Sequence, residues 1–175
     1  MLRRTLSLLV LVAAAMPGVG MTLHGAAREV SALDVESVRA LVRVVLAGGA
    51  EIDMQDSGGD TALMVAARHG RTEMVLALLE VGAEMEHQSA DGLTALMQAA
   101  GNGRLGIVRA LVDAGAQVDR GSQDGKTALM MAAYHGGKEV VRALLEGGAA
   151  ANLQSADGHT ALMVAAMYRY KENPV

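Results

Sequence analysis

The sequence repeats one tetrapeptide at a constant interval. Thr-Ala-Leu-Met begins at four positions, each 33 residues after the one before, namely Thr61, Thr94, Thr127 and Thr160. A period of this length is typical of repeat architectures, in which each unit is one supersecondary module that buries its apolar face only against its neighbours. The chain is therefore predicted to be a row of similar modules, and its function is expected on their surface.

The pattern within each unit predicts two short helices. Thr61 is a good helix N-cap, and Leu63, Ala66 and Ala67 follow at the spacing of one helical face. A second apolar face lies within residues 74–79, and the later units match it. A glycine follows each second helix and is predicted to act as a left-handed C-cap. These glycines are Gly82, Gly115 and Gly148.

About ten polar or small residues connect one unit to the next. The connections end in the dipeptides Asp91-Gly92, Asp124-Gly125 and Asp157-Gly158, which are tight-turn signals. We therefore expect each connection to project as a short hairpin. Serines occupy the same turn position in three connections, and capping of the turn is a better interpretation than a nucleophile without a base. They are Ser89, Ser122 and Ser155.

These landmarks resemble the ankyrin repeat family. Its 33-residue unit opens with Thr-Pro-Leu-His-x-Ala, carries Gly-Ala after the second helix, and has Asp-x-x-Gly before the next Thr. Residues 49–166, about two thirds of the chain, match this pattern. Ala62 stands in place of the family's Pro and Met64 in place of its His, and the other copies depart in the same way. The resemblance implies an all-α ankyrin-repeat solenoid of stacked helix-turn-helix units with short β-hairpin connections.

The repeat register gives the domain boundaries. They are a targeting segment at 1–20, a degenerate N-terminal repeat at 21–57, ankyrin repeats at 58–90, 91–123 and 124–156, and a partial C-terminal repeat at 157–175. In the first repeat the register position of the Thr is Arg28, and the string 22–27 resembles a first helix displaced by about six residues. The last repeat has no second helix. Either its lone helix is a cap, or the sequence is a fragment of a longer array.

The N-terminus is typical of a secretory signal peptide. Arg3 and Arg4 precede a largely apolar stretch, residues 5–16, which is followed by small residues and Pro17. We expect cleavage between Met16 and Met21. An uncleaved signal anchor, a mitochondrial presequence and a mistaken start also fit. A real signal implies a secreted, periplasmic or secretory-pathway protein; otherwise the protein is expected to be cytoplasmic, and it contacts a membrane only if the segment is an uncleaved anchor.

Little in the sequence indicates catalysis, so we expect no enzyme activity, cofactor, metal or small-molecule substrate. The chain has no cysteine, which excludes disulfides and thiolate chemistry. His69 and His135 occupy the same register position two units apart, on the order of 20 Å, so they cannot share a metal and are expected to be exposed. A net charge of −4 and a pI of about 5.7 disfavour nucleic acid as a partner.

The chain contains 12 methionines but no phenylalanine or tryptophan. Four of them share one register position, and we expect them to fill the first-helix layer. They are Met64, Met97, Met130 and Met163. The alternative is a soft Met surface that serves binding or is switched by oxidation.

The resemblance implies that the protein binds other proteins through hairpin tips and the concave face of the first helices. Tyr134 is the best anchor, since it is the only aromatic residue on the inner face of a complete unit. The positions carried over are Gln55, Ser57, Asp60, Arg68, His69, Gln88, Ala90, Asp91, Leu93, Asn102, Gln123, Asp124, Lys126, Tyr134, His135, Gln154, Asp157, His159 and Met167.

Three functions follow as hypotheses. The favoured one is a non-enzymatic scaffold or adaptor that binds a protein partner of unknown identity. The second is a fragment of a larger multidomain ankyrin protein whose activity lies outside this chain. The third is a structural repeat protein that self-associates through its C-terminal unit.

Overall fold

The computed structural model describes residues 23–29, 35–135 and 137–172. These residues form nine α-helices and no strand, which confirms the all-α prediction. The chain groups into two compact units, Met1–Glu84 and Met85–Val175. The predicted targeting segment, residues 1–20, lies outside the described residues.

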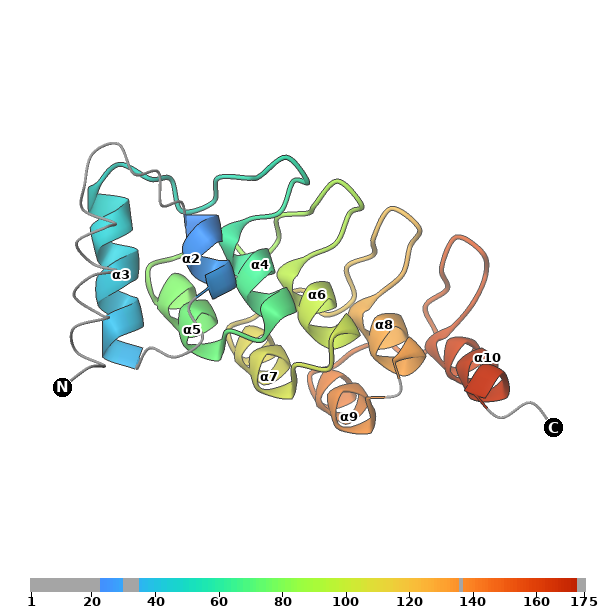
Figure 1. The fold of residues 1–175 in the computed structure, drawn as a ribbon. Helices are drawn as coiled ribbons and strands as arrows, with labels where there is room; N and C mark the ends of the chain where they lie inside the picture. Colours follow the sequence, from blue (N-terminus) through green and yellow to red (C-terminus); the bar gives the residue numbers. More distant parts are fainter. Residues whose placement is uncertain (1–22, 30–34, 136, 173–175) are drawn as a thin grey trace. The chain divides into compact units, whose positions relative to one another are not determined.

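The first unit contains two helix pairs. These are α2 (Leu23–Glu29) with α3 (Val35–Ala47), and α4 (Ala62–His69) with α5 (Thr72–Glu80). Helix α2 packs on α4, α3 packs on α5, and α4 packs on α5 (Figure 1). A helix therefore does form where the sequence suggested a displaced first helix.

The second unit has five helices. They are α6 (Ala95–Gly101), α7 (Leu105–Asp113), α8 (Ala128–Tyr134), α9 (Lys138–Glu146) and α10 (Ala161–Glu172). The first helices α6, α8 and α10 lie in a row, so that α8 packs against both of the others (Figure 1). Helix α7 packs on α6 and α9, and α9 packs on α8. No second helix follows α10 within the described part of the chain.

The predicted caps are present. The hydroxyls of Thr61, Thr94 and Thr127 each accept a hydrogen bond from the amide of the Met three residues later, at 3.3–3.4 Å. Each second helix is followed by a glycine in the left-handed region, as at Gly115, where φ is 92°. The helix boundaries are thus set locally, by the threonine and glycine register.

The first-helix layer is built from small and flexible apolar side chains. Met64, Met97 and Met130 are fully buried, which confirms for these three that Met packs where the family has His. The prediction is wrong for Met163, which is half exposed. Helix α8 packs against three other helices, whereas α10 packs mainly on α8, so the equivalent position of α10 is left uncovered.

Each connection forms a tight turn. In all four turns the amide of the first residue donates to the carbonyl oxygen of the fifth at 2.9–3.0 Å, and the glycine amide donates back to the first carbonyl at 2.8–2.9 Å. The turn glycines have φ between 68° and 76°. The described residues on either side of the turns form no strand, so the hairpin is limited to the turn itself. The four turns span residues 56–60, 89–93, 122–126 and 155–159.

Candidate functional site

A groove of about 350 Å³ lies in the second unit, between α8, α10 and the turns that precede them. Its floor is apolar and comes from two successive repeats. The floor residues are Met130, Met131 and Tyr134 of α8 with Val164 and Met167 of α10. Gly101, Lys126, His135, Ser155, Asp157 and His159 complete the lining.

The groove collects six of the positions that the resemblance predicted as partner-binding. The six are Lys126, Tyr134, His135, Asp157, His159 and Met167. Tyr134 is 47% exposed, and its ring meets that of His135 edge to face, with centroids 5.1 Å apart. The neighbouring Ala132 and Ala133 are buried. Tyr134 therefore stands out from the packed layer with an open aromatic surface.

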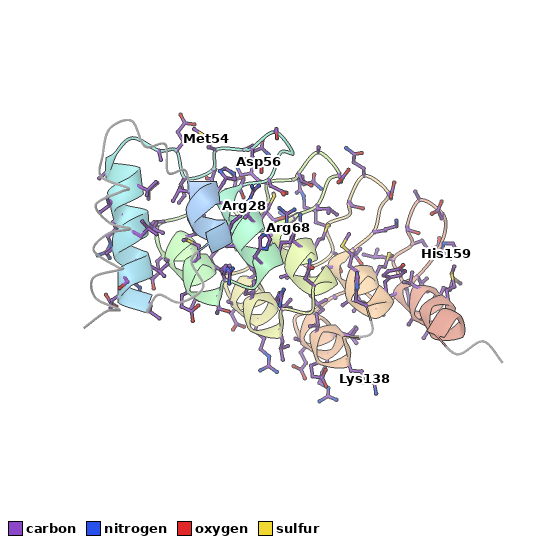
Figure 2. All side chains as sticks on the ribbon, in the orientation of Figure 1. Arg28, Met54, Asp56, Arg68, Lys138 and His159 are labelled. Carbon is purple, nitrogen blue, oxygen red and sulfur yellow. The ribbon has the colours of Figure 1, made fainter. Side chains whose placement is uncertain are left out.

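The last turn holds His159 at the edge of the groove. The Ser155 hydroxyl accepts a hydrogen bond from the His159 amide at 3.2 Å, and the same geometry recurs with Ser89 and Ser122 in the preceding turns. These contacts confirm that the serines cap turns. Figure 2 shows His159 where this turn enters α10.

The turn tips of the second unit are linked to one another. The amide of Gln123 donates to the carbonyl oxygen of Asp91 at 3.3 Å, and the amide of Ala156 donates to that of Asp124 at 2.8 Å. The exposed carboxylate of Asp124 forms an ion pair with Lys126 at 3.3 Å. The rim above the groove is therefore a connected row of turns rather than a set of separate loops.

Two predicted residues of this unit, the half-buried Gln88 and the exposed Asn102, make side-chain hydrogen bonds within the protein. The side-chain amide of Gln88 donates to the carbonyl oxygens of Gly92 at 2.7 Å and Gly121 at 3.0 Å. The side-chain amide of Asn102 donates to the carbonyl oxygen of Gln98 at 2.8 Å. These amide groups support the turn and the end of α6.

The remaining predicted residues of the second unit lie at the tips. Asp91, Gln123 and Gln154 are exposed, and Leu93 is half-buried. The Gln123 side chain donates to the carbonyl oxygen of Ala90 in the preceding turn. None of these positions lines the groove described above.

In the first unit, Asp60 differs from the expectation of a surface residue because it is buried. Its carboxylate forms an ion pair with Arg68 at 2.7 Å, its amide donates to Asp56 at 3.1 Å, and its carbonyl oxygen accepts from His24 Nε2 at 2.7 Å. Asp60 is the centre of an internal polar network. Arg68 is half-buried, with its guanidinium directed to this network.

The other three predicted residues of the first unit, Gln55, Ser57 and His69, are exposed. Gln55 donates through its side chain to the carbonyl oxygen of Gly59 at 2.9 Å, within the same turn. His69 lies at the end of α4. The prediction that His69 and His135 are exposed is confirmed.

The contacts that hold α2 were not predicted from the sequence. His24 is buried, and Arg28 forms an ion pair with Asp56 at 3.3 Å while its carbonyl oxygen accepts from Arg71 at 2.9 Å. The available signal was His24, a polar residue within an otherwise apolar helical string, which could have indicated a buried polar contact. These bonds connect α2 to the first turn and to the residue that precedes α5.

The carboxylate of Asp56 is stabilised by the turn that contains it. Burial alone would raise its pKa, but hydrogen bonds from the amides of Gly58 and Asp60, at 2.8 and 3.1 Å, lower it below the ordinary value. The positive charge of Arg28 acts in the same direction. Asp56 therefore takes the structural role that serine has in the later turns.

None of the helices in the part of the chain that the structure describes has the length and apolarity of a transmembrane span.

The family model for ankyrin repeats, described as "Ankyrin repeats (3 copies)", matches residues 23–122 and 117–173. The chain belongs to the ankyrin repeat family. A comparison with curated proteins finds no match. Ankyrin repeats are generally protein-protein interaction modules and are typically non-enzymatic. The ankyrin repeats of this chain thus carry, in the second unit, a groove lined by residues of two successive repeats.

Proposed function

We propose that the protein is a non-enzymatic scaffold that binds a protein partner through the α8–α10 groove and the adjoining turn tips. The observation that carries this proposal is the exposed ring of Tyr134 beside an apolar floor. In α6 and α8 the other apolar side chains are buried or half-buried, so the ring of Tyr134 is the exposed apolar surface of these two helices. Exposed aromatic residues next to a pocket are typical energetic anchors of interfaces.

The groove suits one or two apolar side chains of a partner segment. Its volume of about 350 Å³ is near the lower end of the range for binding pockets, and its floor is formed by thioether, aliphatic and aromatic groups. The rim carries one cation, Lys126, one anion, Asp157, and two imidazoles. Charges of both signs favour a mixed polar flank on the partner over a run of like charges.

The α8 side of the groove and the turns above it are held in place before any partner arrives. Helix α8 packs against three helices, and the turns above the groove are linked through main-chain hydrogen bonds. A preformed site loses less conformational entropy on binding than a mobile one. This supports a surface that binds without rearrangement.

The test begins with a library of random peptides displayed on phage and panned against the full chain. The dissociation constant of a selected peptide is then measured for the parent and for Tyr134→Ala. Truncation of a central aromatic anchor is expected to cost about 1–2 kcal/mol of binding, roughly 5–30-fold in affinity. The melting temperature is expected to stay nearly unchanged because Tyr134 lies outside the packed layer.

Arg109→Ala and Glu146→Ala are the matched controls. Both residues are exposed on second helices, α7 and α9, and neither lines the groove. They are expected to alter affinity by less than about twofold. Retained binding by the Tyr134 variant, with loss in these two variants, would place the interface on the second helices and refute the proposal.

We further propose that residues 1–20 are a cleaved secretory signal, as the arginine pair and the apolar stretch suggest. Cleavage is expected between Met16 and Met21. N-terminal sequencing of natively expressed protein tests this, and recovery of an intact Met1 terminus from the cytosol would contradict it.

A further inference from the structure

Thioether side chains make up much of the groove floor. Met130, Met131 and Met167 supply three of its five side chains. We propose that Met131 and Met167 are sites of oxidation to methionine sulfoxide, and that this modification weakens apolar binding in the groove. The inference rests on the proposed function, because it concerns regulation of the same site.

Met131 and Met167 differ from three of the four register methionines in their exposure to solvent. Met167 is 50% exposed and Met131 is half-buried, whereas Met64, Met97 and Met130 are buried. Gly101 adds to the solvent access of the Met131 side chain, because it has no side chain of its own. A β-carbon at that position would lie 3.9 Å from the Met131 sulfur, so a side chain there would lie against a thioether that glycine leaves uncovered.

The chemistry requires a small peroxide as oxidant. One oxygen atom passes from the peroxide to the thioether, so that the O–O bond breaks, an S–O bond forms, and hydrogen peroxide leaves as water. The sulfur is oxidised by two electrons and the peroxide is reduced by two. Because the chain has no cysteine, no thiol of its own competes for the oxidant.

The physical effect is a reversal of polarity in the floor. A sulfoxide is polar and chiral where the thioether was apolar and flexible, and it disrupts surfaces built on methionine. Two of the five floor side chains would change in this way. An apolar partner side chain would then have to desolvate two strong acceptors without providing donors to them.

The first experiment needs no partner. The full chain is treated with hydrogen peroxide, and sulfoxide formation at each methionine is followed by mass spectrometry of peptides. Met167 is expected to react as fast as the exposed Met54 and Met163, Met131 more slowly, and the buried Met64, Met97 and Met130 at least about tenfold more slowly than Met167. Oxidation of Met131 and Met167 no faster than that of Met64 would overturn the inference.

The second experiment measures binding of the peptide selected on the parent protein, before and after peroxide. Oxidation is expected to weaken the parent at least about tenfold, and treatment with methionine sulfoxide reductases is expected to restore affinity. The double variant Met131→Leu with Met167→Leu keeps an apolar floor of similar volume and is expected to retain affinity after peroxide.

Met163→Leu and Met54→Leu are the controls, since these exposed methionines lie outside the groove lining. Both variants are expected to lose affinity on oxidation as the parent does. Circular dichroism of each oxidised protein distinguishes a local effect from unfolding, and loss of the helical signal in the parent would overturn the inference.

Two results separate the inference from the proposed function. If the peptide binds in a Tyr134-dependent manner and the oxidised parent keeps its affinity, the inference is wrong while the proposed function stands. An equal loss in parent and double Leu variant also refutes it, because the damage would then lie elsewhere. If no peptide binds in a Tyr134-dependent manner, both fail.

Discussion

Helices α8 and α10 share the tetrapeptide Thr-Ala-Leu-Met, in which the threonine precedes the helix, and have different environments. In both, the cap threonine accepts a hydrogen bond from the methionine amide three residues later, at 3.4 Å. Yet Leu129 of α8 is 3% exposed and Leu162 of α10 is 79% exposed. An identical tetrapeptide therefore produces the same local helix start and very different burial.

The difference lies in the neighbours. Helix α8 packs against α6, α9 and α10, whereas α10 packs mainly against α8. In repeat proteins the stability of a unit is the sum of an intrinsic part and an interface part with each neighbour. The two helices share the tetrapeptide and its cap, so the difference in burial at this leucine position lies in the interfaces with neighbouring helices.

The largest expected effect concerns the leucine pair. Leu129→Ala removes a fully buried side chain and is expected to cost about 2–5 kcal/mol of unfolding free energy. Leu162→Ala removes a side chain that is mostly in solvent and is expected to stay within about 0.5 kcal/mol. Urea denaturation followed by circular dichroism measures both. Equal losses would mean that the outer face of α10 is covered in solution.

The second prediction compares the cost of alanine at two turn glycines, Gly92 and Gly158. Gly92 and Gly158 have φ of 74° and 76°, so alanine at either position is strained by about 1–2 kcal/mol. At Gly92 the new β-carbon would also lie 2.5 Å from the backbone nitrogen of Gln123, whereas at Gly158 nothing lies within 4 Å. We expect Gly92→Ala to cost at least about 1 kcal/mol more than Gly158→Ala, since overpacking adds to strain.

Gly125→Ala is an intermediate case between Gly92→Ala and Gly158→Ala. Its β-carbon would lie 3.2 Å from the backbone nitrogen of Ala156, a tight distance but not a severe overlap. The denaturation midpoints are therefore expected to fall in the order Gly158, Gly125, Gly92, from smallest loss to largest. A different order would mean that the linked turns separate more easily than their hydrogen bonds indicate.

The sequence predicts well what is local to one unit. Thr127, the turn serines and the left-handed glycines each act within a few residues of themselves, so the 33-residue register identifies them. Burial of Leu162 cannot be inferred in the same way, because it depends on a neighbouring element rather than on the tetrapeptide.

Long-range polar contacts were the least predictable. Asp60 was expected on the surface because its register position is at a turn, but His24, 36 residues earlier, donates to its carbonyl oxygen. The string that forms α2 lacks the Thr-Ala-Leu-Met tetrapeptide of the other repeats, so no periodic signal indicates this bond. In the groove, Tyr134 was predicted as an anchor. The apolar floor around it was not predicted, because it is formed by side chains of two different repeats.

The smallest expected effect concerns the caps. The Thr127 and Thr160 hydroxyls accept hydrogen bonds of the same length, so the local cost of removing either is expected to be the same, about 1 kcal/mol. Helix α8 is coupled to three helices, and Thr127→Ala is therefore expected to lower the global unfolding free energy by about that amount. Helix α10 can open while α8 stays folded, so Thr160→Ala is expected to leave the urea midpoint nearly unchanged. Its effect is expected instead as faster amide hydrogen exchange in the first turn of α10.

Serine at either position keeps the hydroxyl and is the matched control. If Thr160→Ala shifts the urea midpoint as much as Thr127→Ala does, α10 unfolds together with α8, and the contrast between the two helices is one of exposure alone.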